Sequence, residues 1–182
     1  MPARQSLEAG AHIINDITAL QGDKRMAEIV RTFRAGLVLM HMQGTPQTMQ
    51  QNPVYNDVTK DVAGFLEARL QAAADLGIAG SRVVLDPGFG FGKAREHNLE
   101  LLARLAELQR LGRPVCLGVS RKGFMGKLLD RPVTERLAAS LAAVCHAMAQ
   151  GAAQIVRVHD VAETRDAVRL LQALQERQRP SV

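Results

Sequence analysis

Aromatic residues are scarce in this sequence of 182 residues, which contains one Tyr, five Phe and no Trp. Proteins that bind single-stranded nucleic acid stack its bases on aromatic side chains, and they gather Lys and Arg into patches. The Lys and Arg residues here are scattered along the chain, so we expect no nucleic-acid partner. The formal net charge of +5 still favours an anionic ligand, and an anionic small molecule meets that requirement.

Cysteines and long apolar runs are also few. Cys116 and Cys145 are too few for a disulfide framework or a cysteine metal cluster, and both lie in apolar surroundings, so we expect reduced core residues. The sequence has no run of about eighteen apolar residues, and its first residues lack the apolar core of a secretion signal. We therefore expect a cytoplasmic protein without a membrane partner, folded as a single domain over residues 1–182.

A glycine-rich segment follows directly after the apolar run at 83–85. It begins at Asp86, has glycines at 88, 90 and 92, and ends at Lys93. Such a segment is costly to order and usually lets the backbone approach a ligand. A phosphate-binding P-loop requires Ser or Thr where Ala94 stands, and a dinucleotide fingerprint requires glycine at the position of Lys93. Both motifs are excluded, which leaves a ligand loop built around Asp86.

Apolar runs alternate with helical patterns along the whole chain. The runs near 13–14, 37–40, 83–85, 115–119 and 155–158 have the length and composition of buried strands. Helix-start signals precede the segments between them, at Asp23, Asp57, Asn98, Thr134 and Asp160. Five repeats of strand and helix predict an α/β protein with a parallel sheet.

Polar side chains follow every expected strand. They are Asn15, Asp16, His41, Gln43, Asp86, Ser120, Arg121, Lys122, Arg157 and His159. Polar residues at the carboxyl end of each successive strand are typical of the mouth of a TIM barrel, whereas a doubly wound sheet gathers them at one crevice. A closed barrel needs eight strands and about 250 residues. The pattern therefore predicts an incomplete TIM (β/α)8 barrel with about five βα units.

Five motifs resemble the strand-end motifs of bacterial dihydropteroate synthase, a pterin-binding TIM-barrel family. In the order found in that family, they occupy Gly10–Ile17, Leu39–Gln50, Leu85–Lys93, Gly118–Lys122 and Arg157–Asp160. The resemblance covers essentially the whole chain. It implies a transferase of folate biosynthesis that joins 4-aminobenzoate to 6-hydroxymethyl-7,8-dihydropterin diphosphate and releases pyrophosphate. It also implies that the five units are strands 4–8 of the barrel and that the chain is truncated at its N-terminus.

The resemblance assigns roles to individual residues. Asp86 would accept hydrogen bonds from the pterin's amino group and ring nitrogen, a pair that a carboxylate matches. The other expected pterin contacts are Asn15, Met40, Gly118 and Lys122. Arg157 and His159 would bind the diphosphate, which agrees with the physical argument that an inward Arg needs an anion. Phe91 and Ser120 would meet the aminobenzoate. The expected catalytic set is Asp86, Lys122, Arg157 and His159, whereas His41 is interpreted as a structural histidine.

The family's mechanism requires no covalent nucleophile. Loss of pyrophosphate would leave a cation at the exocyclic methylene, which the arylamine then attacks. Mg²⁺ is the cofactor that the family implies, but its usual asparagine ligand lies in an earlier loop, so we expect no metal ligand in this chain. The family's dimer contact uses the last helices of the barrel, and we therefore expect a homodimer.

Several alternatives stay open at this point. The chain is a fragment or a mis-called start, a truncated homologue that completes its barrel with another polypeptide, or a relative that binds pterin or assembles without catalysis. A pterin-dependent methyltransferase is the second enzymatic reading. The segments Ser120–Lys122 and Arg157–His159 argue against it, because no diphosphate leaves in methyl transfer.

Overall fold

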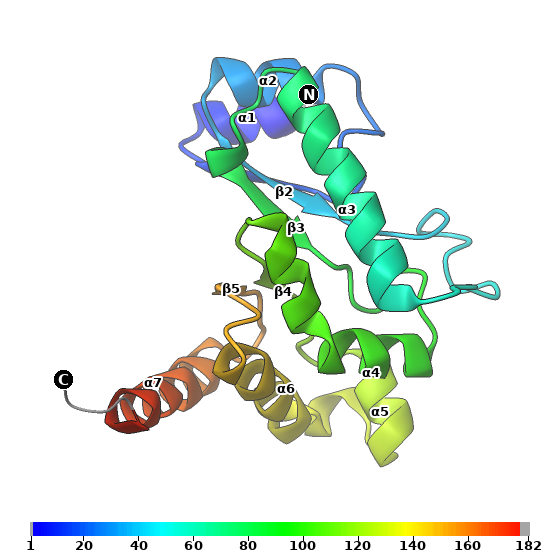
Figure 1. Ribbon diagram of the computed structural model, residues 1–182, viewed down its shortest axis with the longest axis vertical. Coiled ribbons are helices and arrows are strands. Elements are labelled where there is room, and N and C mark those ends of the chain that lie inside the picture. Colours follow the sequence, from blue (N-terminus) through cyan, green and yellow to red (C-terminus); the bar gives the residue numbers. More distant parts are fainter. Residues whose placement is uncertain (1, 179–182) are drawn as a thin grey trace.

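The computed structural model describes residues 2–178, in which helices and parallel strands alternate (Figure 1). In chain order, the elements are α1 (Pro2–Glu8), β1 (Ile13–Asp16), α2 (Met26–Thr32), β2 (Gly36–Met40), α3 (Val58–Asp75), β3 (Val83–Asp86), α4 (Arg95–Ala103), β4 (Cys116–Leu117), α5 (Gly123–Leu129), α6 (Leu137–Ala149), β5 (Ile155–Val156) and α7 (Val161–Gln178). Short 3₁₀ helices occupy Gly80–Arg82, Leu105–Leu111 and Val133–Glu135. The predicted α/β architecture is confirmed.

The strands follow one another in chain order and all run parallel. β1, β2 and β3 form one sheet, and β4 pairs with β5 in a second. A parallel bridge between Leu85 and Val115 joins the two sheets, with the Leu85 amide donating to the Pro114 carbonyl at 2.9 Å. This order is the one that successive βα units produce, because each helix returns the chain to the start of the next strand.

One face of these sheets is covered by helices and holds the core. Leu37, Leu39, Leu85 and Leu117 alternate onto this face and are fully buried. Burial of each such side chain contributes about 1.5–3 kcal/mol, so this layer is a main source of stability. The opposite face is exposed at the two edge strands, where Ile13 on β1 is 54% exposed and Ile155 on β5 is 39% exposed, whereas Val38 and Met40 on β2 are buried.

Some helix starts differ from the expected ones. Asp57 does cap α3, because its carboxylate accepts from the Lys60 amide at 3.0 Å. Asn98, however, lies inside α4, which begins at Arg95, and α6 begins at Leu137, after a 3₁₀ turn that contains Thr134. The predicted starts of these two helices were wrong because the spacing of apolar residues does not show where a helix gains a turn or where a 3₁₀ turn precedes it.

Two other expected caps have different partners. Asp23 accepts from the Arg25 amide at 2.8 Å in the turn before α2, and the carboxylate of Asp160 binds Arg121 rather than the first amides of α7. The unpredicted helix α5 is the next element after β4. Neither cysteine is paired, and Cys116 is buried while Cys145 is partly exposed. No helix within residues 2–178 is both long and apolar enough to cross a membrane.

Candidate functional site

The strand register places expected pterin residues on the face of the sheets opposite the core. Val38 lies beside Asn15, Met40 lies beside Asp86, and Cys116 lies beside Ile155. Side chains alternate along a strand, so residues paired in register and those two positions away share a face. By this alternation Asn15, Met40 and Asp86 share the face opposite the core, and Gly118 and Arg157 directly follow β4 and β5. Of the expected pterin and diphosphate residues, the structure thus brings Asp86, Gly118 and Arg157 together.

Asp86 is the buried centre of this group. It is 0% exposed, and its Oδ1 accepts a 2.8 Å hydrogen bond from the Gly88 amide in the glycine loop. Its Oδ2 accepts from Arg157 Nη2, also at 2.8 Å. A carboxylate offers about four lone-pair sites, so both oxygens keep capacity for further donors.

Arg157 lies across Gly118 to reach Asp86. A Cβ on Gly118 would stand only 2.5 Å from Arg157 Nη2, so any other residue at this position would clash with the guanidinium. Arg157 Nη1 also approaches Cys116 Sγ at 3.7 Å. The Arg157 side chain remains 44% exposed, so its charge is available to a ligand from solvent.

Ser120 and His159 form a second contact on this edge. The Ser120 hydroxyl lies 3.0 Å from His159 Nδ1 and accepts from the His159 amide at 3.2 Å. Ser120 is buried whereas His159 is exposed. With Nδ1 engaged, Nε2 is the ring nitrogen left for an anionic ligand.

An ion pair joins the ends of β4 and β5. Arg121 Nε donates to Asp160 Oδ2 at 3.0 Å, and the Arg121 amide donates to the Ser140 hydroxyl at 2.9 Å. Arg121 holds a left-handed backbone conformation with φ of 56°, which these contacts keep in place. Because Lys122 follows Arg121 and His159 precedes Asp160, this ion pair holds the segments of Lys122 and His159 next to each other.

Lys122 reaches back over the glycine loop. Its Nζ lies 4.3 Å from the centre of the Phe91 ring, a cation–π contact. Burial lowers the pKa of Lys122, with the charge of Asp86 acting in the opposite direction. Lys122 therefore joins the loop that contains Asp86 to the start of α5.

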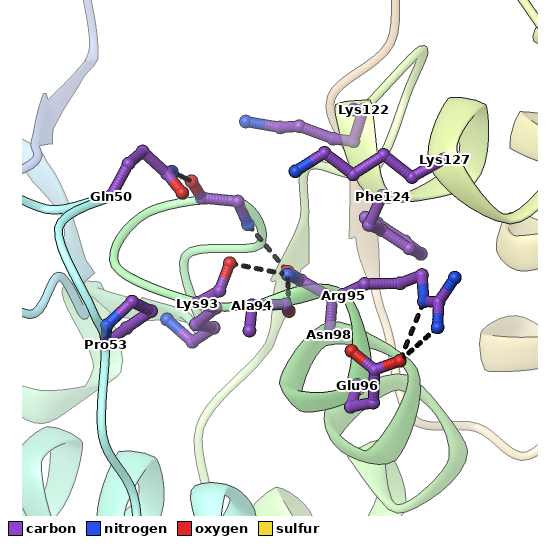
Figure 2. Close-up of a pocket in the computed structure, with 12 residues that line it drawn as sticks. Gln50, Pro53, Lys93, Ala94, Arg95, Glu96, Asn98, Lys122, Phe124 and Lys127 are labelled. Carbon is purple, nitrogen blue, oxygen red and sulfur yellow. Dashed lines mark hydrogen bonds and ion pairs between the residues drawn. The ribbon is translucent and has the colours of Figure 1, made fainter.

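A cavity of about 680 Å³ opens beside Lys122 (Figure 2). Its lining residues are Gln50, Pro53, Gly90, Lys93, Ala94, Arg95, Glu96, Asn98, Lys122, Gly123, Phe124 and Lys127. Four of its five charged side chains are basic, and the carboxylate of the fifth, Glu96, is paired with Arg95 at 2.8 Å. The cavity thus suits an anionic ligand of moderate size. Ser120 is not among its lining residues.

Sequence reasoning missed the contacts that hold the glycine loop. Lys93 Nζ lies 2.8 Å from His41 Nδ1, and Asn98 Oδ1 accepts from the Gly90 amide at 2.7 Å. Burial lowers the pKa of Lys93 to about 7, and burial together with the charge of Lys93 lowers the pKa of His41 to about 3. His41 is therefore a buried, hydrogen-bonded histidine, as interpreted. For the contacts of the loop, the sequence offered one indication, namely the lysine at position 93 that ends the glycine-rich segment.

The described residues do not fit a magnesium site. Within residues 2–178 no group of three or more His, Cys, Asp or Glu side chains is arranged to hold a metal ion. The side chains of Arg157 and His159, the expected diphosphate residues, carry no oxygen ligand, and Asp86 and Asp160 are each paired with an arginine. Mg²⁺ prefers carboxylate and water oxygens, which this arrangement does not offer.

Fold and site together define an α/β protein with a ligand site at the carboxyl ends of its parallel strands. The family described as pterin binding enzyme matches residues 2–159, and the chain belongs to that family.

Its relatives include dihydropteroate synthases. The enzyme of Escherichia coli strain K12 is 45% identical over 170 residues, which are 93% of this chain and 60% of that protein. The structure of dihydropteroate synthase from Stenotrophomonas maltophilia with active site-bound imidazole gives a TM-score of 0.92 at 44% identity, covering 98% of this chain and 66% of that one. The Xanthomonas albilineans enzyme in complex with 7,8-dihydropteroate gives 0.87 at 42% identity, covering 95% and 63%. The chain thus spans 60% of the length of its Escherichia coli relative.

Proposed function

We propose that this chain carries the pterin- and diphosphate-binding residues of a dihydropteroate synthase, a transferase of folate biosynthesis. The C–O bond between the pterin's exocyclic methylene and the diphosphate breaks, a C–N bond to 4-aminobenzoate forms, and pyrophosphate and a proton leave. The observation that carries this proposal is the meeting of Asp86, Gly118 and Arg157 at the carboxyl ends of β3, β4 and β5. The complex of the Xanthomonas albilineans relative with 7,8-dihydropteroate, the compound this reaction forms, supports it.

The pterin is proposed to bind at Asp86. Its amino group and ring nitrogen are a donor pair, and the buried carboxylate offers two oxygens at matching separation. Asn15 supplies a donor and an acceptor on the same face, and Met40 and Gly118 form the walls of the slot. Lys122 contacts the ring from the β4 side. Burial of Asp86 strengthens this recognition, since water does not compete for the carboxylate.

Arg157 and His159 are proposed to bind the diphosphate. Both belong to the segment that follows β5, and Ser120 orients the imidazole through Nδ1. Charge accumulates on the diphosphate as the C–O bond breaks, so these donors stabilise the transition state more than the bound substrate. The remaining work is to hold the arylamine in line with the methylene carbon.

The aminobenzoate is proposed to enter from the 680 Å³ cavity beside Lys122. Its contact with Phe91 stays a prediction, since Phe91 is not among the lining residues and its ring faces Lys122. The basic lining of the cavity suits the carboxylate of this substrate. The assignment of Ser120 to the aminobenzoate stays a prediction, since the Ser120 hydroxyl contacts His159. Mg²⁺ is proposed only as a counter-ion that arrives with the diphosphate.

The finer architecture is also a proposal. The sequential parallel order of β1 to β5 supports their assignment as strands 4–8 of a (β/α)8 barrel, in a single pterin-binding domain over residues 1–182. We further propose a cytoplasmic homodimer that uses the C-terminal helices. An apolar groove of about 380 Å³ between α4, α5 and α6 supports this contact, and Leu128 and Leu129 at its rim are 51% and 49% exposed.

Two assays on the purified chain test the proposed function. In the first, dihydropteroate formation and pyrophosphate release are measured with Mg²⁺ present, with the Escherichia coli enzyme as positive control. In the second, binding of the pterin diphosphate is measured by calorimetry for the wild type and for Asp86→Ala. Turnover supports the synthase. Pterin binding without turnover supports a non-catalytic homologue, and absence of binding in the wild type overturns both.

A further inference from the structure

Lys93 has an unusual environment for a lysine. At 3% exposure it is the only Lys or Arg among residues 2–178 that is buried. Its Nζ lies 2.8 Å from His41 Nδ1, 3.0 Å from the Gly88 carbonyl oxygen and 3.1 Å from the Phe91 carbonyl oxygen. None of these partners is a carboxylate. Burying an amino group in this way is unfavourable unless hydrogen bonds satisfy it, and these three contacts match the three donors of its charged form.

Two of the three contacts lie within the glycine loop, residues 87–92. The Gly88 peptide is held from both sides, because its amide donates to Asp86 Oδ1 at 2.8 Å while its carbonyl accepts from Lys93. The loop also packs directly on the end of β2. A Cβ on Gly88 would stand 1.9 Å from the His41 carbonyl oxygen, and Gly88 has a φ of 67°. Lys93 thus joins the two ends of the loop to each other and to His41.

The position of Phe91 depends on the same contacts. Its carbonyl accepts from Lys93, its amide donates to the Gly88 carbonyl at 3.1 Å, and its ring faces Lys122. A change at Lys93 would therefore be transmitted to the carboxylate on one side of the loop and to the aromatic ring on the other.

We infer that Lys93 is a positioning residue: its contacts with Gly88, Phe91 and His41 hold the glycine loop in the arrangement that receives the pterin. The inference rests on the proposed function. Lys93 acts through the loop, so its loss should weaken pterin binding and leave the diphosphate contacts at Arg157 and His159 in place.

The test compares the wild type with Lys93→Met and with the charge-matched control Lys24→Met, which changes an exposed lysine. Hydrogen exchange of residues 86–93 is measured by mass spectrometry, and binding of the pterin diphosphate and of pyrophosphate by calorimetry. For Lys93→Met we expect loop exchange and the pterin diphosphate Kd to rise about tenfold, the effect of losing one strong hydrogen bond. The pyrophosphate Kd should stay within about twofold, and Lys24→Met should behave as the wild type.

Two results would overturn the inference. One is unchanged loop exchange and pterin affinity in Lys93→Met. The other is a loss of pyrophosphate affinity by the same factor, which indicates a general effect on folding. If Lys93→Met does not fold, His41→Phe, which keeps a ring and removes the acceptor, must show the same pattern at smaller amplitude, and wild-type exchange in it also overturns the inference. Absence of pterin binding in the wild type refutes the proposed function, while the exchange measurement still decides the role of Lys93.

Discussion

The guanidinium of Arg157 donates to the carboxylate of Asp86 at 2.8 Å, although β3 and β5 belong to different sheets. The Asp86 side chain is 1% exposed and that of Arg157 is 44% exposed, so one partner is fixed and the other can move. Arg157 thus occupies an oxygen that the proposed pterin site would use. If the pterin binds at Asp86 and the diphosphate at Arg157, as proposed, the two contacts are coupled, since the diphosphate would draw Arg157 away from Asp86.

Asp86→Asn tests the carboxylate. The amide keeps the size of the side chain but replaces one acceptor with a donor, which faces the donors of the pterin. We expect the pterin diphosphate Kd to rise at least about a hundredfold, the loss typical of a buried charged hydrogen-bond partner. Calorimetry checks this, with the exposed Asp75→Asn as control. Wild-type affinity in Asp86→Asn would remove Asp86 from the pterin site.

Gly118→Ala tests whether the absence of a side chain at Gly118 is needed for the position of the Arg157 guanidinium. The added methyl group would meet Nη2 at 2.5 Å, so the guanidinium must leave Asp86. We expect about tenfold weaker binding of the pterin diphosphate, because the methyl group narrows the proposed slot at Gly118 and displaces the guanidinium that is proposed to bind the diphosphate. Tm should change by only a few degrees, because the displaced atoms belong to a flexible side chain. Gly64→Ala on α3, where a Cβ meets nothing within 4 Å, is the matched control. Equal affinities for the two variants would contradict the role of Gly118.

Ser120→Ala tests the orientation of His159. Without the hydroxyl, Nδ1 loses its 3.0 Å contact and the imidazole can rotate. We expect pyrophosphate affinity to fall about three- to tenfold, the effect of one neutral hydrogen bond. Binding of a pterin that has no diphosphate should stay unchanged, and Ser81→Ala, at an exposed serine, is the control. Loss of pterin binding in Ser120→Ala would indicate a role other than orienting His159.

His41 gives the protein a specific dependence on pH. Its pKa is lowered from 6.5 to about 3 by burial, so the unfolded state binds an additional proton between these values. Its contribution to stability is present above pH 6.5 and is lost as the pH falls towards 3. The loss is at most about 1.4 kcal/mol for each pH unit. Urea unfolding from pH 7.5 to 4.5 should therefore show a steeper decline for the wild type than for His41→Phe, and parallel declines would show that His41 does not titrate.

Leu128→Lys tests the proposed homodimer. Leu128 lies at the apolar groove between α4, α5 and α6 and is 51% exposed. A charge at that position cannot be buried in a self-association without a partner, so we expect a shift from dimer to monomer in light scattering. Leu76→Lys, at an exposed leucine that follows α3 and lies outside the C-terminal helices, is the control. A dimer that persists in Leu128→Lys would exclude the groove from the contact.

The sequence predicted the strands and the polar groups at their ends because buried parallel strands appear as continuous apolar runs with abrupt ends. The shared face of Asn15, Met40 and Asp86 then follows from alternation. The roles of Lys93 and Asn98 were not accessible in this way. They depend on the path of a loop with three left-handed glycines and on a contact between Lys93 and His41, 52 positions apart in the chain. Short-range sequence patterns predict neither the path of that loop nor that contact.

The junction between β3 and β4 has a consequence for how the protein melts. Within residues 2–178, the three-stranded and two-stranded sheets are joined by the bridge at Leu85 and Val115, and the pair of Asp86 and Arg157 spans the same junction. A pterin diphosphate that contacts both sides would add a link across this junction. Because one hydrophobic core already spans both sheets, its binding energy would appear as a higher Tm of a single thermal transition.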